Sequence, residues 1–127
     1  MNVALQKFRD KSVLQFDVLE DSKFAEEDVF VDVDEKNILT SNGIDYLEDY
    51  PKSLVIVGAG VIGCEYATIF SNFGKTKVYL IDRQDDILPF EDQDIISMVS
   101  GNLENRGVTI HHNASLVRLE KKDNEVE

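Results

Sequence analysis

The sequence predicts an α/β domain, a parallel sheet in the order βαβαβ followed by an antiparallel meander at the C-terminal end. A continuous apolar, β-branched run at residues 54–57 is typical of a strand that is buried on both faces of a parallel sheet. Strands and helices then alternate in units of the length that right-handed crossovers require. With 127 residues, 43% of them hydrophobic, the chain has the size and composition of a single domain.

The N-terminal third carries most of the acidic excess. Its first 50 residues contain 5 basic and 13 acidic side chains. Residues 1–30 mix scattered apolar positions with a dense carboxylate run, which favours a weakly ordered, solvated segment. Residues 29–33 predict a short strand, and a turn and a one- or two-turn helix come next, the helix beginning after Ser41 or Asn42 and ending before Pro51.

The predicted central unit begins with the apolar strand at 54–57. A glycine-rich turn and a helix of about three turns come after it, and Gly74 is placed to cap the end of that helix. Residues 77–82 (KVYLID) predict a second buried strand. The polar connection after it is interrupted by Ile87, Leu88 and the helix-blocking Pro89.

A second helix begins near Asp92 and Asp94, whose carboxylates complement its dipole, and it ends at Gly107. Residues 108–112 (VTIHH) predict a third strand and residues 115–120 (SLVRLE) a fourth. Because no helix lies between these two strands, we expect them to pair in the antiparallel sense. The last seven residues predict a turn into a fifth strand that is cut off, so the fold is expected to be truncated.

One motif carries chemistry. Gly58, Gly60 and Gly63 form GAGVIG directly between the strand and the helix, and Asp82 ends the next strand. In a Rossmann-like fold the first glycine allows the tight turn, the second lets the backbone approach a pyrophosphate, and the third lets helix and strand pack closely. The helix N-terminus offers amide groups to the phosphates. The pattern predicts a dinucleotide site, although a glycine-rich turn with a purely structural role stays an alternative.

The acid at the end of the second strand also bears on cofactor choice. Asp82 is placed to accept hydrogen bonds from ribose hydroxyls and would repel a 2′-phosphate, which favours NAD(H) over NADP(H). Arg83 could pair with that phosphate and argues the other way. Glu65, two residues after the last glycine, is expected in the first turn of the helix, where an acid also complements the dipole.

Composition excludes several other functions. A formal charge of −12 opposes sequence-independent binding to nucleic acid or to an anionic membrane surface. The single cysteine, Cys64, excludes an internal disulfide, and its place predicts a packed small residue instead of a nucleophile.

Adjacent His111 and His112 would point to opposite faces of a strand, so a shared metal is not expected. With no apolar stretch of signal-peptide or membrane-helix length, a cytoplasmic location is expected.

Three strings extend the motif into a family resemblance: GAGVIGCEYATIF at 58–70, KVYLIDRQDDILPFEDQDI at 77–95 and RGVTIHHNASLVRLE at 106–120. Together they resemble the NAD-binding domain of FAD-dependent pyridine nucleotide disulfide oxidoreductases. Within that family, GVIGCEYA and HHNA look most like the soluble pyridine nucleotide transhydrogenase branch, with dihydrolipoamide dehydrogenase next. The resemblance covers about three-quarters of the chain, and it places the NAD(P)-binding domain at residues 31–127 with its core at 51–127.

The resemblance implies roles residue by residue. It places the pyrophosphate loop at Gly58 to Gly63, a position beside the nicotinamide at Val61, an acid near nicotinamide and flavin at Glu65, and the adenosine ribose acid at Asp82. No residue of this chain is assigned a catalytic role. The candidate cofactor-binding residues are Gly58, Ala59, Gly60, Val61, Ile62, Gly63, Glu65, Asp82 and Arg83.

In such a flavoenzyme the domain would hold NAD(P)H while its hydride passes to FAD, which a separate flavin domain binds, and the parent would form a homodimer through a further domain. The FAD-binding glycine motif and the CxxxxC pair typical of the family are not in this sequence. We therefore expect these 127 residues to bind nucleotide without turnover. A dihydrolipoamide dehydrogenase NAD domain and a non-enzymatic nucleotide-sensing module stay open as alternatives.

Overall fold

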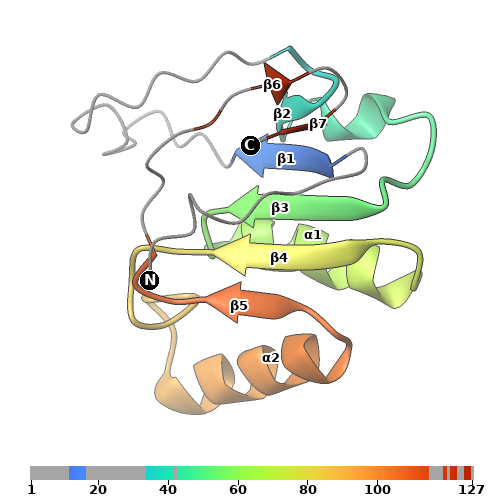
Figure 1. The fold of residues 1–127 in the computed structure, drawn as a ribbon. Coiled ribbons are helices and arrows are strands. Elements are labelled where there is room, and N and C mark those ends of the chain that lie inside the picture. The colour runs from blue at the N-terminus through green and yellow to red at the C-terminus, as the bar shows by residue number, and fades with distance from the viewer. Residues whose placement is uncertain are drawn as a thin grey trace.

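The computed structural model describes residues 12–16, 34–41, 43–114, 119, 121–122 and 125–126. A five-stranded parallel sheet with the order β2-β1-β3-β4-β5 forms its centre (Figure 1). The α/β class and the parallel sheet that the sequence predicts are thus confirmed. The strands are β1 (Ser12–Phe16), β2 (Ile38–Thr40), β3 (Ser53–Val57), β4 (Lys77–Ile81) and β5 (Thr109–His111).

Strand β3 lies where the order of the sheet reverses. The strands that precede it in the chain, β1 and β2, lie on one side of it, and β4 and β5 lie on the other. In open α/β sheets, ligands bind outside the carboxyl ends of the strands at such a reversal. The residues that come directly after β3 and β4 therefore stand where a binding site is expected.

Strand β1 is not among the predicted elements, because the sequence pattern favours a weakly ordered segment at residues 1–30. It pairs in parallel with β2 on one side and with β3 on the other, Phe16 standing opposite Val57 in the register. An internal parallel strand does not need the strict alternation of apolar and polar residues that identifies a half-buried strand. Because its apolar residues alternate imperfectly and lie next to a run of carboxylates, β1 is not recognised as a strand from the sequence.

The segment before β3 also differs from the prediction. The sequence predicts a turn where β2 lies, and the helix expected before Pro51 is a single 3₁₀ turn, η3 (Ile44–Tyr46). Asp34 shapes this region, because its Oδ1 accepts the amides of Lys36, Asn37 and Ile38 at 2.8–3.0 Å and so forms a tight turn before β2. The strand predicted at 29–33 lies outside the described residues.

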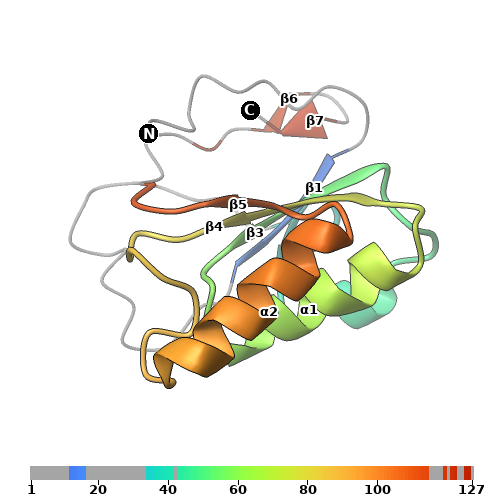
Figure 2. The ribbon, with the colours of Figure 1, turned by 90° about the horizontal axis from the view of Figure 1, so that it is seen from below.

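Two helices cover one face of the sheet (Figure 2). They are α1 (Val61–Asn72), between β3 and β4, and α2 (Gln93–Asn105), between β4 and β5. Both end as predicted, at Gly74 and Gly107, whose φ angles of 66° and 89° are positive. After α2, the amides of Gly107 and Val108 donate to the carbonyls of Glu104 and Leu103 and so complete a Schellman cap.

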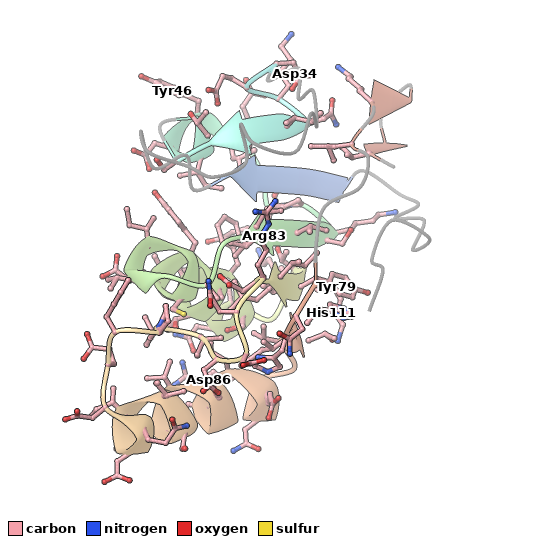
Figure 3. All side chains as sticks on the ribbon, turned by 90° about the vertical axis from the view of Figure 1, so that its left-hand side faces the viewer. Asp34, Tyr46, Tyr79, Arg83, Asp86 and His111 are labelled. Atoms are coloured by element: carbon pink, nitrogen blue, oxygen red, sulfur yellow. The ribbon has the colours of Figure 1, made fainter. Side chains whose placement is uncertain are left out.

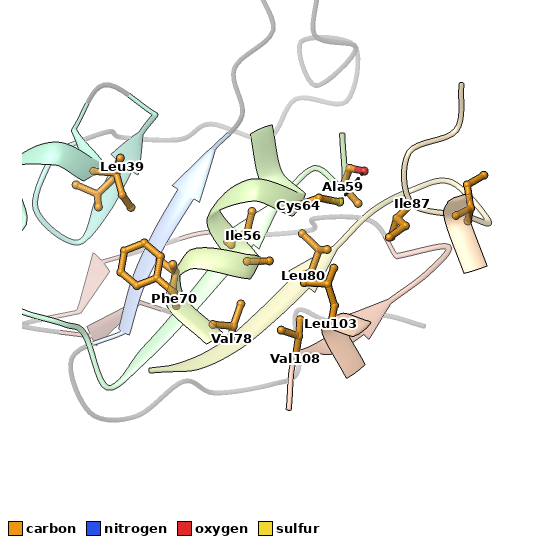
Figure 4. Close-up of a cluster of buried hydrophobic side chains, with 14 residues drawn as sticks. Leu39, Ile56, Ala59, Cys64, Phe70, Val78, Leu80, Ile87, Leu103 and Val108 are labelled. Atoms are coloured by element: carbon orange, nitrogen blue, oxygen red, sulfur yellow. Dashed lines mark hydrogen bonds between the residues drawn. The ribbon is translucent and has the colours of Figure 1, made fainter. Parts of the chain in front are cut away.

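Buried side chains fill both sides of the sheet. Between the sheet and the helices, a cluster that includes Leu54, Ile56, Leu80, Ala67 and Leu103 forms the main core (Figure 4). The opposite face has a smaller cluster, to which the C-terminal end contributes.

That C-terminal end contains β6 (Lys121–Lys122) and β7 (Glu125–Val126), which pair with each other in the antiparallel sense. This hairpin is not the antiparallel pair that the sequence predicts between residues 108–112 and 115–120, because β5 pairs in parallel with β4. Leu119 and Val126 belong to the smaller cluster with Val55, Val57 and Ile81. The strand predicted at 115–120 lies, apart from Leu119, outside the described residues.

Candidate functional site

The glycine-rich turn joins the carboxyl end of β3 to the first residue of α1. Gly58 has a φ of 105°, a conformation that favours glycine, and its amide donates to the Ile81 carbonyl at 2.8 Å. Gly60 precedes the helix as its N-cap residue, with φ −75° and ψ −170°. These angles suit any residue, so the backbone conformation alone does not require glycine at position 60.

Gly63 is the point of closest approach between α1 and β3. A Cβ atom placed there would overlap the carbonyl oxygen of Gly58 and would lie 3.4 Å from Cγ2 of Ile56. The obstacle is main-chain atoms, which cannot move aside as the end of a long side chain can. Glycine at this position is what allows the first turn of α1 to start directly over the end of β3.

Asp82 connects the second strand to this turn. Its Oδ2 accepts the Ala59 amide at 2.6 Å and its Oδ1 accepts the Gln84 amide at 2.7 Å. The two predicted parts of the fingerprint, 23 residues apart in the chain, are therefore in direct contact. Both carboxylate oxygens have a fixed direction, and Asp82 keeps part of its surface exposed.

The Ala59 carbonyl is held from the other side. It accepts the Leu88 amide at 2.8 Å, and the Cys64 thiol lies 3.5 Å from it. Ala59 itself is completely buried. Because its amide and its carbonyl both have partners within the protein, Ala59 holds the turn in place and offers no free amide to a ligand in this structure.

The N-terminus of α1 offers the anion-binding groups. The first four amides, those of Gly60, Val61, Ile62 and Gly63, have no acceptor within the helix. The helix also has no side-chain cap and no acid in its first turn. Such amides, together with the positive end of the helix dipole, can bind an anion such as a phosphate group. The sequence predicts Glu65 in the first turn, but it is the fifth residue of the helix and is exposed.

Three further candidates flank this end of the sheet. The side chain of Val61 is 58% exposed and that of Ile62 is 39% exposed, and Ile69, farther along α1, is exposed as well. Arg83 comes directly after Asp82 in the loop after β4, is half-buried, and lies in the same loop as Asp86 (Figure 3). All nine predicted positions thus lie in the turn, in the first two turns of α1 or just after β4.

Cys64 and the two histidines, the other reactive side chains that the sequence singles out, lie in packed surroundings. Burial, followed by the charge of Asp82, raises the pKa of the Cys64 thiol to about 11, as expected for a packed residue. His111 stacks on Tyr79 (Figure 3), and burial together with the neighbouring His112 lowers its pKa. Within the described ranges, no three His, Cys, Asp or Glu side chains gather to hold a metal ion. No helix in the same ranges is long and apolar enough to span a bilayer.

The loop before α2 contributes a part of the site that sequence reasoning misses. Ile87 is fully buried in the main core. The Leu88 amide donates a hydrogen bond to the Ala59 carbonyl of the turn. The sequence contains one indication of this attachment, an apolar pair inside a loop that is otherwise polar and rich in carboxylates. Such a pair indicates that the loop is attached to the core and does not extend into solvent.

Comparison with known proteins places this geometry in a family. The family described as pyridine nucleotide-disulphide oxidoreductase matches residues 53–127. Two similar curated proteins are the soluble pyridine nucleotide transhydrogenases of Pseudomonas savastanoi pv. phaseolicola and Azotobacter vinelandii, 43% and 46% identical over 96 residues. Each alignment covers 76% of this chain and 20% of the relative, so the chain spans about a fifth of their length.

A solved structure of a related flavoprotein is also similar to this chain. The HOCl-induced flavoprotein disulfide reductase RclA from Escherichia coli superimposes with a TM-score of 0.62 at 37% sequence identity, over 66% of this chain and 19% of that one. The family match covers more than half of the 127 residues and includes the glycine-rich turn, Asp82 and both helices. The chain belongs to the pyridine nucleotide-disulphide oxidoreductase family.

Proposed function

We propose that this chain is the NAD(H)-binding domain of an FAD-dependent pyridine nucleotide oxidoreductase of the transhydrogenase type. One observation carries the proposal: the Asp82 carboxylate is bonded to the Ala59 amide and so stands beside the free amides at the start of α1. An acceptor for ribose hydroxyls and a donor set for a pyrophosphate then lie at one edge of the sheet.

The site fits the dinucleotide in three respects. Gly63 brings the helix N-terminus close to β3, Gly60 presents no side chain to an approaching phosphate, and Asp82 has an accessible carboxylate. The negative charge of Asp82 disfavours a 2′-phosphate, so NAD(H) is the expected ligand, and Arg83 is the residue that would admit NADP(H). The acidic character of the whole chain adds to this preference, because NADP(H) carries the extra phosphate.

The protein's contribution is orientation. The bound nucleotide supplies a hydride, which a flavin accepts in the parent enzyme. The exposed Val61 and Ile62, at the start of α1, would lie against the nicotinamide or against the flavin domain, and no group of this chain is proposed to move a proton. The 127 residues therefore bind nucleotide, and turnover requires the flavin domain.

Substitution of Gly60 tests the assigned loop. Because the φ and ψ angles of Gly60 suit any residue, Gly60→Val should fold with little loss of stability, yet its side chain would occupy the approach of the pyrophosphate. We expect the dissociation constant for NADH, measured by calorimetry, to rise at least a hundredfold while the thermal midpoint stays close to that of the wild type.

Gly101→Val, in α2, is the matched control, because nothing lies within 4 Å of a Cβ atom at that position. It should leave the affinity unchanged. Full NADH affinity in a folded Gly60→Val variant would show that the pyrophosphate does not pass this turn.

A further inference from the structure

The loop between β4 and α2 attaches to the glycine-rich turn through main-chain atoms. The Leu88 amide donates to the Ala59 carbonyl at 2.8 Å, the same carbonyl that the Cys64 thiol approaches. Ile87, the preceding residue, is fully buried in the main core, and Figure 4 shows it at the same end of this core as Ala59 and Cys64. The loop is thus anchored by the buried Ile87, with the Leu88 side chain packed against the same core, and the Leu88 amide links it to the turn.

This link fixes the direction of an amide in the proposed phosphate site. The Ala59 carbonyl and the Gly60 amide belong to one peptide group, and in a trans peptide they point in opposite directions. With the carbonyl held by Leu88, the Gly60 amide must point away from the loop. It is the first of the four amides at the start of α1 that have no acceptor within the helix.

The preceding peptide group is held in the same manner. The Ala59 amide is bonded to Asp82, which directs the Gly58 carbonyl toward the position that Gly63 leaves open. Two consecutive peptide groups of the turn are therefore oriented from outside, one by a carboxylate and one by the Leu88 amide. Asp82 alone fixes only the first of them.

The backbone of Leu88 supports a role beyond loop closure. Its φ angle is 49°, in the left-handed region that a bulky residue rarely adopts. Unfavourable backbone conformations persist where the surrounding structure determines them, and they cluster at functional sites. Leu88 is held here by the bond from its amide to Ala59, by the bond from the Glu91 amide to its carbonyl, and by packing of its side chain beside the buried Ile87.

We propose that Ile87 and the Leu88 amide are positioning residues for the nucleotide: they hold the Ala59–Gly60 peptide so that the Gly60 amide faces the pyrophosphate. The inference rests on the proposed function. It adds residues that contact no ligand themselves and act through the orientation of the turn. The contact with Ala59 comes from the Leu88 amide, and the Leu88 side chain packs against the main core beside Ile87.

Truncation of the anchor is the first test. Ile87→Ala should raise the dissociation constant for NADH about tenfold at a temperature where the variant is fully folded, and Ile87→Val should restore most of the affinity. Leu103→Ala is the matched control, since Leu103 is equally buried in the same core, near the C-terminal end of α2. It should lose comparable stability and keep the wild-type affinity. Equal affinity losses in the two variants would mean that Ile87 acts only through stability.

A second measurement needs no nucleotide. Amide hydrogen exchange by NMR should show the Leu88 and Ala59 amides protected in the free wild-type chain. Both should lose protection in Ile87→Ala, while those of Leu54 and Leu80 in the sheet keep it.

The outcomes separate the two proposals. An unprotected Leu88 amide in the wild type, or an unchanged NADH affinity in a folded Ile87→Ala variant, would overturn the positioning role and leave the proposed function intact. A wild-type chain that binds no nucleotide would overturn the proposed function, and the positioning of a ligand would fall with it even if the exchange pattern were as expected.

Discussion

Gly63 and Gly101 occupy helices of the same fold and are expected to respond to the same substitution in opposite ways. At Gly63 a methyl group would meet the carbonyl of Gly58, whereas at Gly101 it would meet nothing within 4 Å. Gly63→Ala should therefore destabilise the fold by about 2 kcal/mol through overpacking. Gly101→Ala should stabilise it by roughly 0.5–1 kcal/mol, because alanine restricts the unfolded chain and favours helix.

Urea unfolding of the two variants, followed by far-ultraviolet circular dichroism, measures both changes in the free energy of unfolding. A stability for Gly63→Ala equal to that of the wild type would mean that α1 can move away from β3 without cost. The explanation of this glycine by close packing would then be wrong.

At the scale of elements, the turn before β2 is tied to the C-terminal hairpin. Asp34 accepts three amides with Oδ1, and its Oδ2 accepts the ammonium group of Lys121, on β6, at 2.7 Å. Partial burial alone would raise the pKa of Asp34, but the hydrogen bonds from Lys121 and from the amides of Ile38, Lys36 and Asn37 hold it well below its ordinary value of 3.8. The folded state therefore favours the ionised carboxylate.

This pKa gives a stability change with a defined sign. A carboxylate whose pKa is depressed by folding contributes its stabilisation above its unfolded pKa and loses it as the pH falls toward the folded value. Asp34→Ala should cost roughly 1–2 kcal/mol at pH 7, and the difference from the wild type should shrink steadily below about pH 4. Lys121→Met should cost less than about 1 kcal/mol, because that ion pair is partly exposed to solvent.

Urea unfolding at several pH values measures these differences. Glu48→Gln, an exposed position, controls for the removal of one negative charge from an acidic chain. A wild-type minus Asp34→Ala difference that stays constant from pH 7 to pH 3 would contradict the role given to the ionised carboxylate.

The elements also show where sequence reasoning succeeds and where it does not. The unit from β3 to β5 can be predicted because its information is local: an apolar run, glycines where positive φ or close approach is needed, and acids at a helix start. β1 and β2 are not predicted from the sequence, because their positions in the sheet depend on pairing between strands that are distant in the chain. No residue type reveals which way an amide points, so the link from Leu88 to Ala59 could be found only in the structure.

At the scale of the whole molecule, the sheet divides into a part that the family match covers and a part that it does not. The part from β3 onward lies within the match at 53–127, and β1 and β2 lie before it. Yet β1 pairs along its whole length with β3, the strand that leads into the glycine-rich turn. Strand β1 is therefore part of the sheet that carries the site.

The central claim is that this assembled edge of the sheet binds NAD(H) through the glycine-rich turn and Asp82. Calorimetric titration of the folded wild-type chain with NADH and with NADPH at the same salt concentration tests it most directly, with Asp82→Asn as the variant and Asp85→Asn, exposed in the same loop, as the charge control. We predict saturable binding at one site, NADH favoured over NADPH in the wild type and in Asp85→Asn, and a reduced preference in Asp82→Asn. Absence of saturable binding of either nucleotide to a folded chain would contradict the account.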